Sequence, residues 1–66
     1  MIKDLIGKTI QLWPGDTYSK YGIIKDVDDF GWLIEITKAA PSSDYEVGSE
    51  YYINHSRPLV FKILPQ

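Results

Sequence analysis

The sequence has no cysteine, a single histidine and no hydrophobic run long enough to cross a bilayer. Without cysteine the chain can form neither a disulfide bond nor a zinc–thiolate site. A membrane-spanning helix needs about 20 apolar residues in succession, so we expect no such helix. The lack of cysteine fits a reducing compartment, and the first eight residues are too few and too charged for a secretory signal. We therefore expect a cytoplasmic protein.

A basic excess is also missing. Seven lysine and arginine residues stand against nine aspartate and glutamate residues, which gives a formal net charge of −2. Proteins that bind nucleic acid usually carry a basic surface, so this balance disfavours that class, although a local patch can differ from the mean. The charge alone is compatible with a protein partner.

The length of 66 residues provides for one small domain, which we assign to residues 1–66. A chain of this size buries only about 60% of the surface of its unfolded state, so we expect low stability. The composition is 44% hydrophobic and 14% aromatic, which is enough for one core.

The centre of the chain predicts a β-hairpin. Residues 23–27 and 32–37 are rich in β-branched side chains and flank the turn Asp28-Asp29-Phe30-Gly31. Aspartate accepts hydrogen bonds from nearby backbone amides in such turns, and glycine at the end tolerates positive φ. The segment 26–31 also begins like a calcium-binding loop, but it lacks most of the oxygen ligands that calcium needs. We interpret it as the hairpin turn and predict no metal site.

Alternating side chains predict three further strands, over residues 9–13, 50–55 and 59–64. Ile10 and Leu12 should face the core, and Tyr51 and Phe61 should help to fill it. The hairpin itself has apolar residues on both faces, which indicates either a β-bulge or a sheet curled into a closed barrel. Two longer segments, residues 14–22 and 38–49, are expected to be loops.

Five short strands with these connections resemble the Src-homology-3-type small barrel. In that family a short helical turn separates the last two strands, and residues 55–58 would form it here. The resemblance implies an all-β, single-domain, Src-homology-3-like barrel of about five antiparallel strands. Because such barrels have many unrelated functions, the fold alone implies none.

A shorter resemblance concerns Ile10-x-Leu12-x-x-Gly15 followed by Lys20-Tyr21-Gly22-Ile23-Ile24. This pattern resembles the KOW motif of ribosomal and transcription-elongation proteins, in which Gly22 and Ile24 would be the glycine and the apolar residue two places later. The resemblance implies nucleic-acid binding. The loop departs from that family at Trp13, Pro14 and Asp16, where the family tends to be basic, and neither resemblance identifies a specific family.

Catalytic groups are scarce. His55 is the only histidine, and a general base needs a nucleophile and an orienting group beside it. The adjacent Ser56 would point to the opposite face of a strand. We also expect no pocket of the roughly 300 Å³ and upward that small-molecule sites occupy. The chain is therefore expected not to be an enzyme and to use no cofactor.

Aromatic residues give the strongest indication of function. Exposed tyrosine and tryptophan provide large contact areas and are concentrated in protein interfaces; the alternative is that they cover the end of an open barrel. The candidate partner-binding residues are Trp13, Tyr18, Tyr21, Tyr45, Tyr52 and Arg57.

We therefore expect a non-enzymatic module that docks a protein partner through the aromatic first loop and the acidic second loop, as an adaptor, an assembly subunit or a small inhibitor. The alternative is a KOW- or Tudor-like nucleic-acid-binding domain, with Lys20 and Arg57 beside stacking rings. Acidic residues in the same loops would repel phosphate; they are Asp16, Asp44, Glu46 and Glu50. The partner's identity and the oligomeric state stay open, since an exposed sheet edge also allows strand addition.

Overall fold

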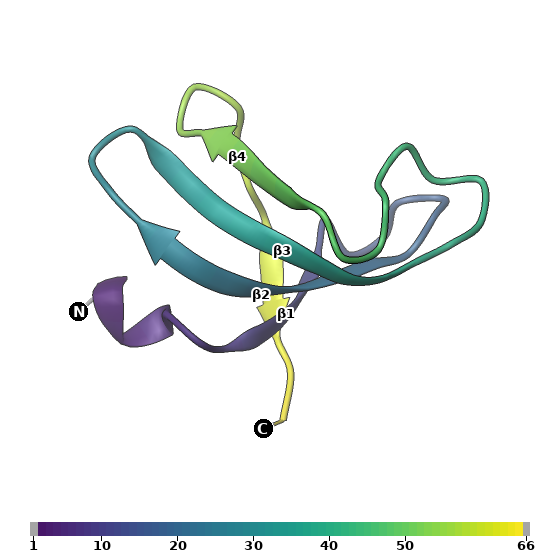
Figure 1. The fold of residues 1–66 in the computed structure, drawn as a ribbon, viewed down its shortest axis with the longest axis horizontal. Coiled ribbons are helices and arrows are strands. Elements are labelled where there is room, and N and C mark those ends of the chain that lie inside the picture. The colour runs from purple at the N-terminus through teal and green to yellow at the C-terminus, as the bar shows by residue number, and fades with distance from the viewer. Residues whose placement is uncertain (1, 66) are drawn as a thin grey trace.

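The computed structural model describes residues 2–65 and shows an all-β domain (Figure 1). A short 3₁₀-helix, η1, precedes five strands, and the predicted fold class is confirmed at this level. The elements are η1 Ile2–Leu5, β1 Thr9–Leu12, β2 Lys20–Val27, β3 Gly31–Ala39, β4 Glu50–Asn54 and β5 Phe61–Ile63. In the part of the chain described, no helix is long and apolar enough to cross a membrane.

The strands form one antiparallel sheet in the order β4-β3-β2-β1-β5. β1 to β4 follow one another, and the chain then returns so that β5 pairs with β1. In Figure 1, β5 (yellow) runs steeply across the direction of β2 and β3. β4 and β5 do not pair in this order, so the sheet is curled but is not closed into a barrel. β5 has three residues and Pro65 follows soon after, which leaves little strand to complete a ring.

Two β-bulges curl the sheet. The register between β2 and β3 shifts between Tyr21 and Gly22 and again between Ile24 and Asp26. A bulge places an extra residue in one strand, bends it and increases its twist. Of the two explanations for apolar residues on both faces of the hairpin, the bulge is therefore correct.

Aliphatic side chains on the inner face form the core. Ile10 and Leu12 are buried, as the alternation predicted, and every side chain that is almost wholly inaccessible is isoleucine or leucine. Tyr51 and Phe61 pack against this cluster but are only half buried, so they line its edge rather than fill it. The fully buried group comprises Ile10, Leu12, Ile24, Ile34 and Ile36.

The hairpin turn is built by Asp28. Its Oδ1 accepts hydrogen bonds from the backbone amides of Phe30 (2.8 Å) and Gly31 (2.9 Å). Gly31, however, is not among the positive-φ glycines, so that part of the prediction is wrong. A Cβ at Gly31 would collide with the carbonyl oxygen of Ile53 on β4. Glycine is needed there because two strands approach closely.

Several boundaries differ from the prediction. β1 ends at Leu12, and Trp13 has φ of 42° outside it. β2 begins at Lys20, so Tyr21 lies in a strand rather than in a loop. Residues 55–58 form a turn, in which the Arg57 amide donates to the Asn54 carbonyl at 2.9 Å, and no helix is assigned there. The loops are therefore residues 13–19 and 40–49.

The close approach at Gly22 predicts a large effect of one methyl group. A Cβ there would lie 2.7 Å from the Glu35 carbonyl oxygen and 2.8 Å from Cγ2 of Ile34, both on β3. We expect Gly22→Ala to lower the free energy of unfolding by about 1–3 kcal/mol, as overpacking does. Urea unfolding measures this change. Thr37→Ala, an exposed site on β3, is the control, and an equal loss in both variants would contradict the explanation.

Candidate functional site

The two loops meet at one end of the molecule. The Ala40 amide donates to the Ser19 carbonyl at 3.1 Å, and the rings of Trp13 and Tyr45 lie 6.3 Å apart. Figure 1 shows both loops at the end opposite the β2–β3 turn. We call residues 13–19 and 40–49 the loop end. Segments that are distant in the sequence thus form one continuous surface.

Trp13 is held in place at the loop end. Its backbone amide donates to the Val60 carbonyl at 2.7 Å, and its indole Nε1 donates to the Pro58 carbonyl at 3.0 Å. The Arg57 guanidinium lies 4.3 Å from the centroid of the indole ring, within the range of a cation–π contact. Trp13 therefore joins the first loop to the segment that leads into β5.

Lys20 is buried, although lysine is rarely buried without a partner. Its Nζ donates to the Tyr18 carbonyl at 2.8 Å and to Oδ2 of Asp16 at 3.2 Å, and it lies 5.9 Å from the centroid of the Trp13 ring. The ammonium closes the first loop from inside. The nucleic-acid interpretation requires an ammonium that is presented to a phosphate. The Lys20 ammonium is instead bonded inside the first loop.

Tyr45 also faces inward. Its ring makes an edge-to-face contact with Tyr51, with centroids 4.9 Å apart, and the Tyr51 hydroxyl accepts the Glu46 amide at 2.9 Å. Of the predicted partner-binding residues, the structure brings together Trp13, Tyr45 and Arg57. The first two are half buried, so they cover the core, as the alternative interpretation of the aromatic residues proposed.

Outside this cluster, an open hollow of about 440 Å³ lies where the two loops meet β2 and β3. Its volume exceeds the expected limit, because the expectation rested on chain length and ignored space between loops. Within residues 2–65, no hydrogen bond uses the side-chain hydroxyls of Thr17, Ser19 or Tyr21. Lys38 supplies the one charge in the lining, 5.8 Å from the Tyr21 ring centroid. The lining residues are Thr17, Ser19, Tyr21, Lys38, Ala39, Ala40 and Pro41.

The two loops that border the hollow also carry exposed apolar and acidic side chains. Tyr18 is 45% exposed and Val47 is 62% exposed. Asp44 and Glu46 lie on the second loop, and both are exposed. Neither carboxylate takes part in a salt bridge within the described residues. The surface therefore combines apolar contact area with available negative charge.

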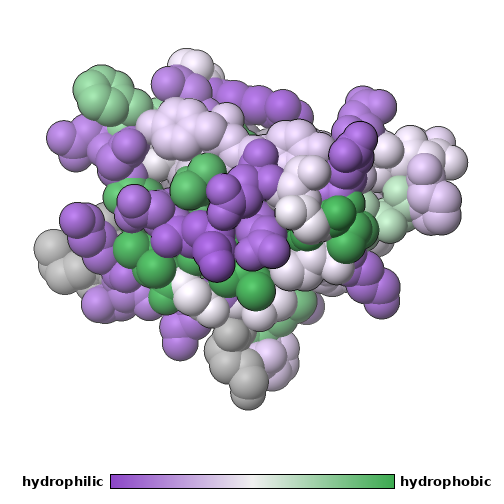
Figure 2. Space-filling model, viewed as in Figure 1, coloured by the Kyte–Doolittle hydropathy of each residue, from purple (hydrophilic) through white to green (hydrophobic). Residues whose placement is uncertain are grey.

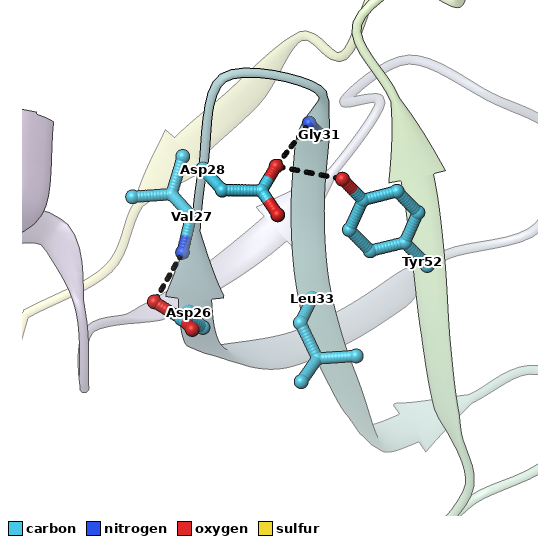
Figure 3. Close-up of a pocket in the computed structure, with 6 residues that line it drawn as sticks. All are labelled: Asp26, Val27, Asp28, Gly31, Leu33 and Tyr52. Atoms are coloured by element: carbon cyan, nitrogen blue, oxygen red, sulfur yellow. Dashed lines mark hydrogen bonds between the residues drawn. The ribbon is translucent and has the colours of Figure 1, made fainter.

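Tyr52, the remaining predicted site residue, lies elsewhere. It is on β4, 51% exposed, and its hydroxyl donates to Oδ1 of Asp28 at 2.7 Å (Figure 3). Beside this pair is a small cavity of about 130 Å³. Nε2 of His55 donates to the Asp28 carbonyl at 3.0 Å, and the imidazole lies edge-on to the Trp32 ring at 5.8 Å. His55 thus has a structural partner at the hairpin turn.

The Asp28–Tyr52 hydrogen bond shifts the pKa values of its two groups in opposite directions. It is the largest cause that lowers the pKa of Asp28 below its ordinary value of 3.8, and the Phe30 amide adds to the effect. It is also the largest cause that raises the pKa of Tyr52 to about 12. Among the residues described, no group of three or more histidine, cysteine, aspartate or glutamate side chains is placed to hold a metal.

These shifts predict the pH dependence of stability. The folded-state pKa of Asp28 is lowered. Its contribution to the free energy of unfolding is therefore present above pH 3.8 and is lost as the pH falls through the folded-state pKa. The folded-state pKa of Tyr52 is raised. Its contribution to the free energy of unfolding is therefore present below pH 10 and is lost as the pH rises towards about 12.

Spectrophotometric titration of the tyrosines tests this pair. We expect one tyrosine to ionise in a late phase, with a pKa of about 12. This late phase should disappear in Tyr52→Phe. Asp28→Asn should return it towards the ordinary range, because the charged acceptor is gone. A late phase that survives in Tyr52→Phe would contradict the assignment.

Comparisons with protein-family models, with curated protein sequences and with solved structures found no match to this chain. Its function must therefore be inferred from the surfaces that the fold presents.

Proposed function

We propose that this chain is a non-enzymatic binding module that docks a protein partner through its loop end. The observation that carries the proposal is the hollow of about 440 Å³ where the two loops meet β2 and β3. Its hydroxyls make no internal hydrogen bonds within the described residues, and its lysine has no carboxylate partner there. These groups are available to a ligand.

A macromolecular ligand fits this surface better than a small molecule. Small-molecule sites enclose most of the ligand, whereas this hollow is open to solvent. The two loops that border it also carry the exposed Tyr18 and Val47. Interfaces are enriched in tyrosine, which provides contact area at low entropic cost. Asp44 and Glu46 add negative charge that favours a partner with a basic surface.

The fold supports a Src-homology-3-like relationship without assigning a family. Five antiparallel strands in one sheet and a tight turn before the last strand agree with that resemblance. The match of Gly22 to the KOW motif has a packing explanation, since β3 leaves no room for a Cβ there. That glycine therefore lends less support to nucleic-acid binding.

A nucleic-acid-binding function is the alternative proposal. It loses support because the Lys20 ammonium bonds inside the first loop and the Arg57 guanidinium lies against Trp13. Binding to a single-stranded oligonucleotide at low salt, falling steeply as salt rises, would favour this alternative. We expect no such binding.

The protein-partner proposal is tested with two substitutions at the loop end and one at the other end. The full chain is immobilised, a partner is captured from an extract of the source cells, and its Kd is then measured with purified protein. Tyr18→Ala should weaken binding about tenfold, by about 1.4 kcal/mol. Glu46→Lys should weaken it too, and more so at low salt.

The matched control is Phe30→Ala. Phe30 is 70% exposed at the hairpin turn. Its substitution removes a similar ring from the opposite end of the molecule and should leave the Kd unchanged. A partner that binds wild type, Tyr18→Ala and Glu46→Lys equally well would overturn the proposal for the loop end.

A further inference from the structure

We propose that β4 pairs with β4 of a second copy, which extends the sheet across a two-fold axis at Tyr52. This surface is separate from the loop end. The sheet is open, and β4 is one of its two edges. An edge strand presents unpaired backbone groups, which are a template for another strand.

Backbone hydrogen bonds fix which groups of β4 point outward. The Ile36 amide donates to the Ser49 carbonyl at 3.0 Å, and the His55 amide donates to the Phe30 carbonyl at 2.7 Å. In an antiparallel pair, hydrogen-bonded and non-hydrogen-bonded positions alternate. Tyr51 and Ile53 therefore bond to β3, whereas Glu50, Tyr52 and Asn54 direct their amides and carbonyls away from it.

Most of these outward groups have no partner within residues 2–65. The Asn54 carbonyl accepts the Arg57 amide at 2.9 Å, but the outward amides and carbonyls of Glu50 and Tyr52 are not used. The side chains of both residues are also exposed. A neighbouring strand can therefore form a ladder with Glu50 and Tyr52, and the Asn54 carbonyl, which has two lone pairs, would accept a second hydrogen bond beside the one from Arg57.

The usual protection against edge pairing is lacking in β4. Lysine, proline and bulges block strand addition, but the sequence of β4 is Glu-Tyr-Tyr-Ile-Asn and its register with β3 is unbroken. The other edge differs, because β5 has three residues, carries Lys62 and is soon followed by Pro65. β4 is thus the edge suited to pairing.

The β4 sequence fits a second copy of itself. In an antiparallel pair centred on Tyr52, this residue lies opposite its equivalent, with its hydroxyl directed to Asp28 at the hairpin turn, and Glu50 lies opposite Asn54 of the second copy. The carboxylate can accept a hydrogen bond from the carboxamide, and no like charges face each other. Leu33 pairs with Tyr52 across β3 and β4, so one row of apolar side chains would run from Leu33 through both tyrosines to the second Leu33.

On the face seen in Figure 2, hydrophobic residues form small separate areas among hydrophilic ones. Pairing through backbone groups does not need a broad apolar patch, since the ladder provides much of the interaction.

Sedimentation equilibrium of the full chain over a range of concentrations tests the proposal. We expect a monomer–dimer equilibrium for wild type and for Tyr52→Phe, which keeps the ring. Tyr52→Lys should lose the dimer, because it places two ammonium groups opposite each other. Mixing Tyr52→Lys with Tyr52→Glu should restore a dimer that contains one of each. Tyr18→Lys, the same change at an exposed tyrosine of the loop end, should remain dimeric.

Hydrogen exchange of wild type supplies a readout without substitution. The amides of Glu50 and Tyr52 should become protected as the protein concentration rises, whereas the amide of Lys62 on the other edge strand, which is already bonded to β1, should not change. A wild-type chain that stays monomeric, or a Tyr52→Lys variant as dimeric as wild type, would overturn the proposal. Neither result bears on partner binding at the loop end.

Discussion

The pairing of β2 with β3 is the interaction on which the rest of the structure depends. These two strands supply three of the five fully buried side chains, Ile24, Ile34 and Ile36. Their two register shifts bend the sheet so that β1 and β4 can pack over the same core. The bend in turn requires Gly22, because β3 approaches to a distance that excludes a Cβ. Curvature, core and strand order thus follow from one irregular pair of strands.

Because the sheet stays open, aromatic side chains cover what a closed ring of strands would have covered. Trp32 on β3 meets Phe61 on β5 edge-to-face, with centroids 5.3 Å apart. At the loop end, the rings of Trp13 and Tyr45 cover the core in the same way, and the Arg57 guanidinium lies against the Trp13 indole. Large rings suit this role, since one side chain can bury area on both sides of a gap. Much of the aromatic content therefore stabilises the domain.

Local patterns predicted the parts of the fold that local physics determines. Alternating side chains predicted that Ile10 and Leu12 lie in the core, and they do. The hairpin turn was predictable from Asp28, because its carboxylate accepts hydrogen bonds from nearby backbone amides. The hydrogen bond from Tyr52 to Asp28 joins residues 24 positions apart, so no local pattern predicts it. Gly31 was identified as a turn residue for the wrong reason, because the proximity of β4 is a tertiary feature.

The candidate site shows the same division. The place of Tyr18 in the aromatic first loop predicts an exposed ring, and Tyr18 is exposed. Lysine is usually a surface charge, and the sequence predicts one at Lys20, but its ammonium bonds to Asp16 and to the Tyr18 carbonyl. Its position at the start of β2, on the inner face, depends on where the loop ends. The hollow depends on both loops and on the ends of β2 and β3 together, so no single segment of the sequence predicts it.

The two proposed surfaces are compatible because they use different parts of the molecule. β4 begins near the second loop and ends near the hairpin turn, so antiparallel pairing of two copies directs their loop ends to opposite ends of the joined sheet. Each loop end then remains accessible. A dimer of this kind presents two equal binding surfaces, and a partner with repeated sites would be held more strongly than a single loop end could hold it. Strand pairing would thereby raise the effective affinity of a small module without any addition to its core.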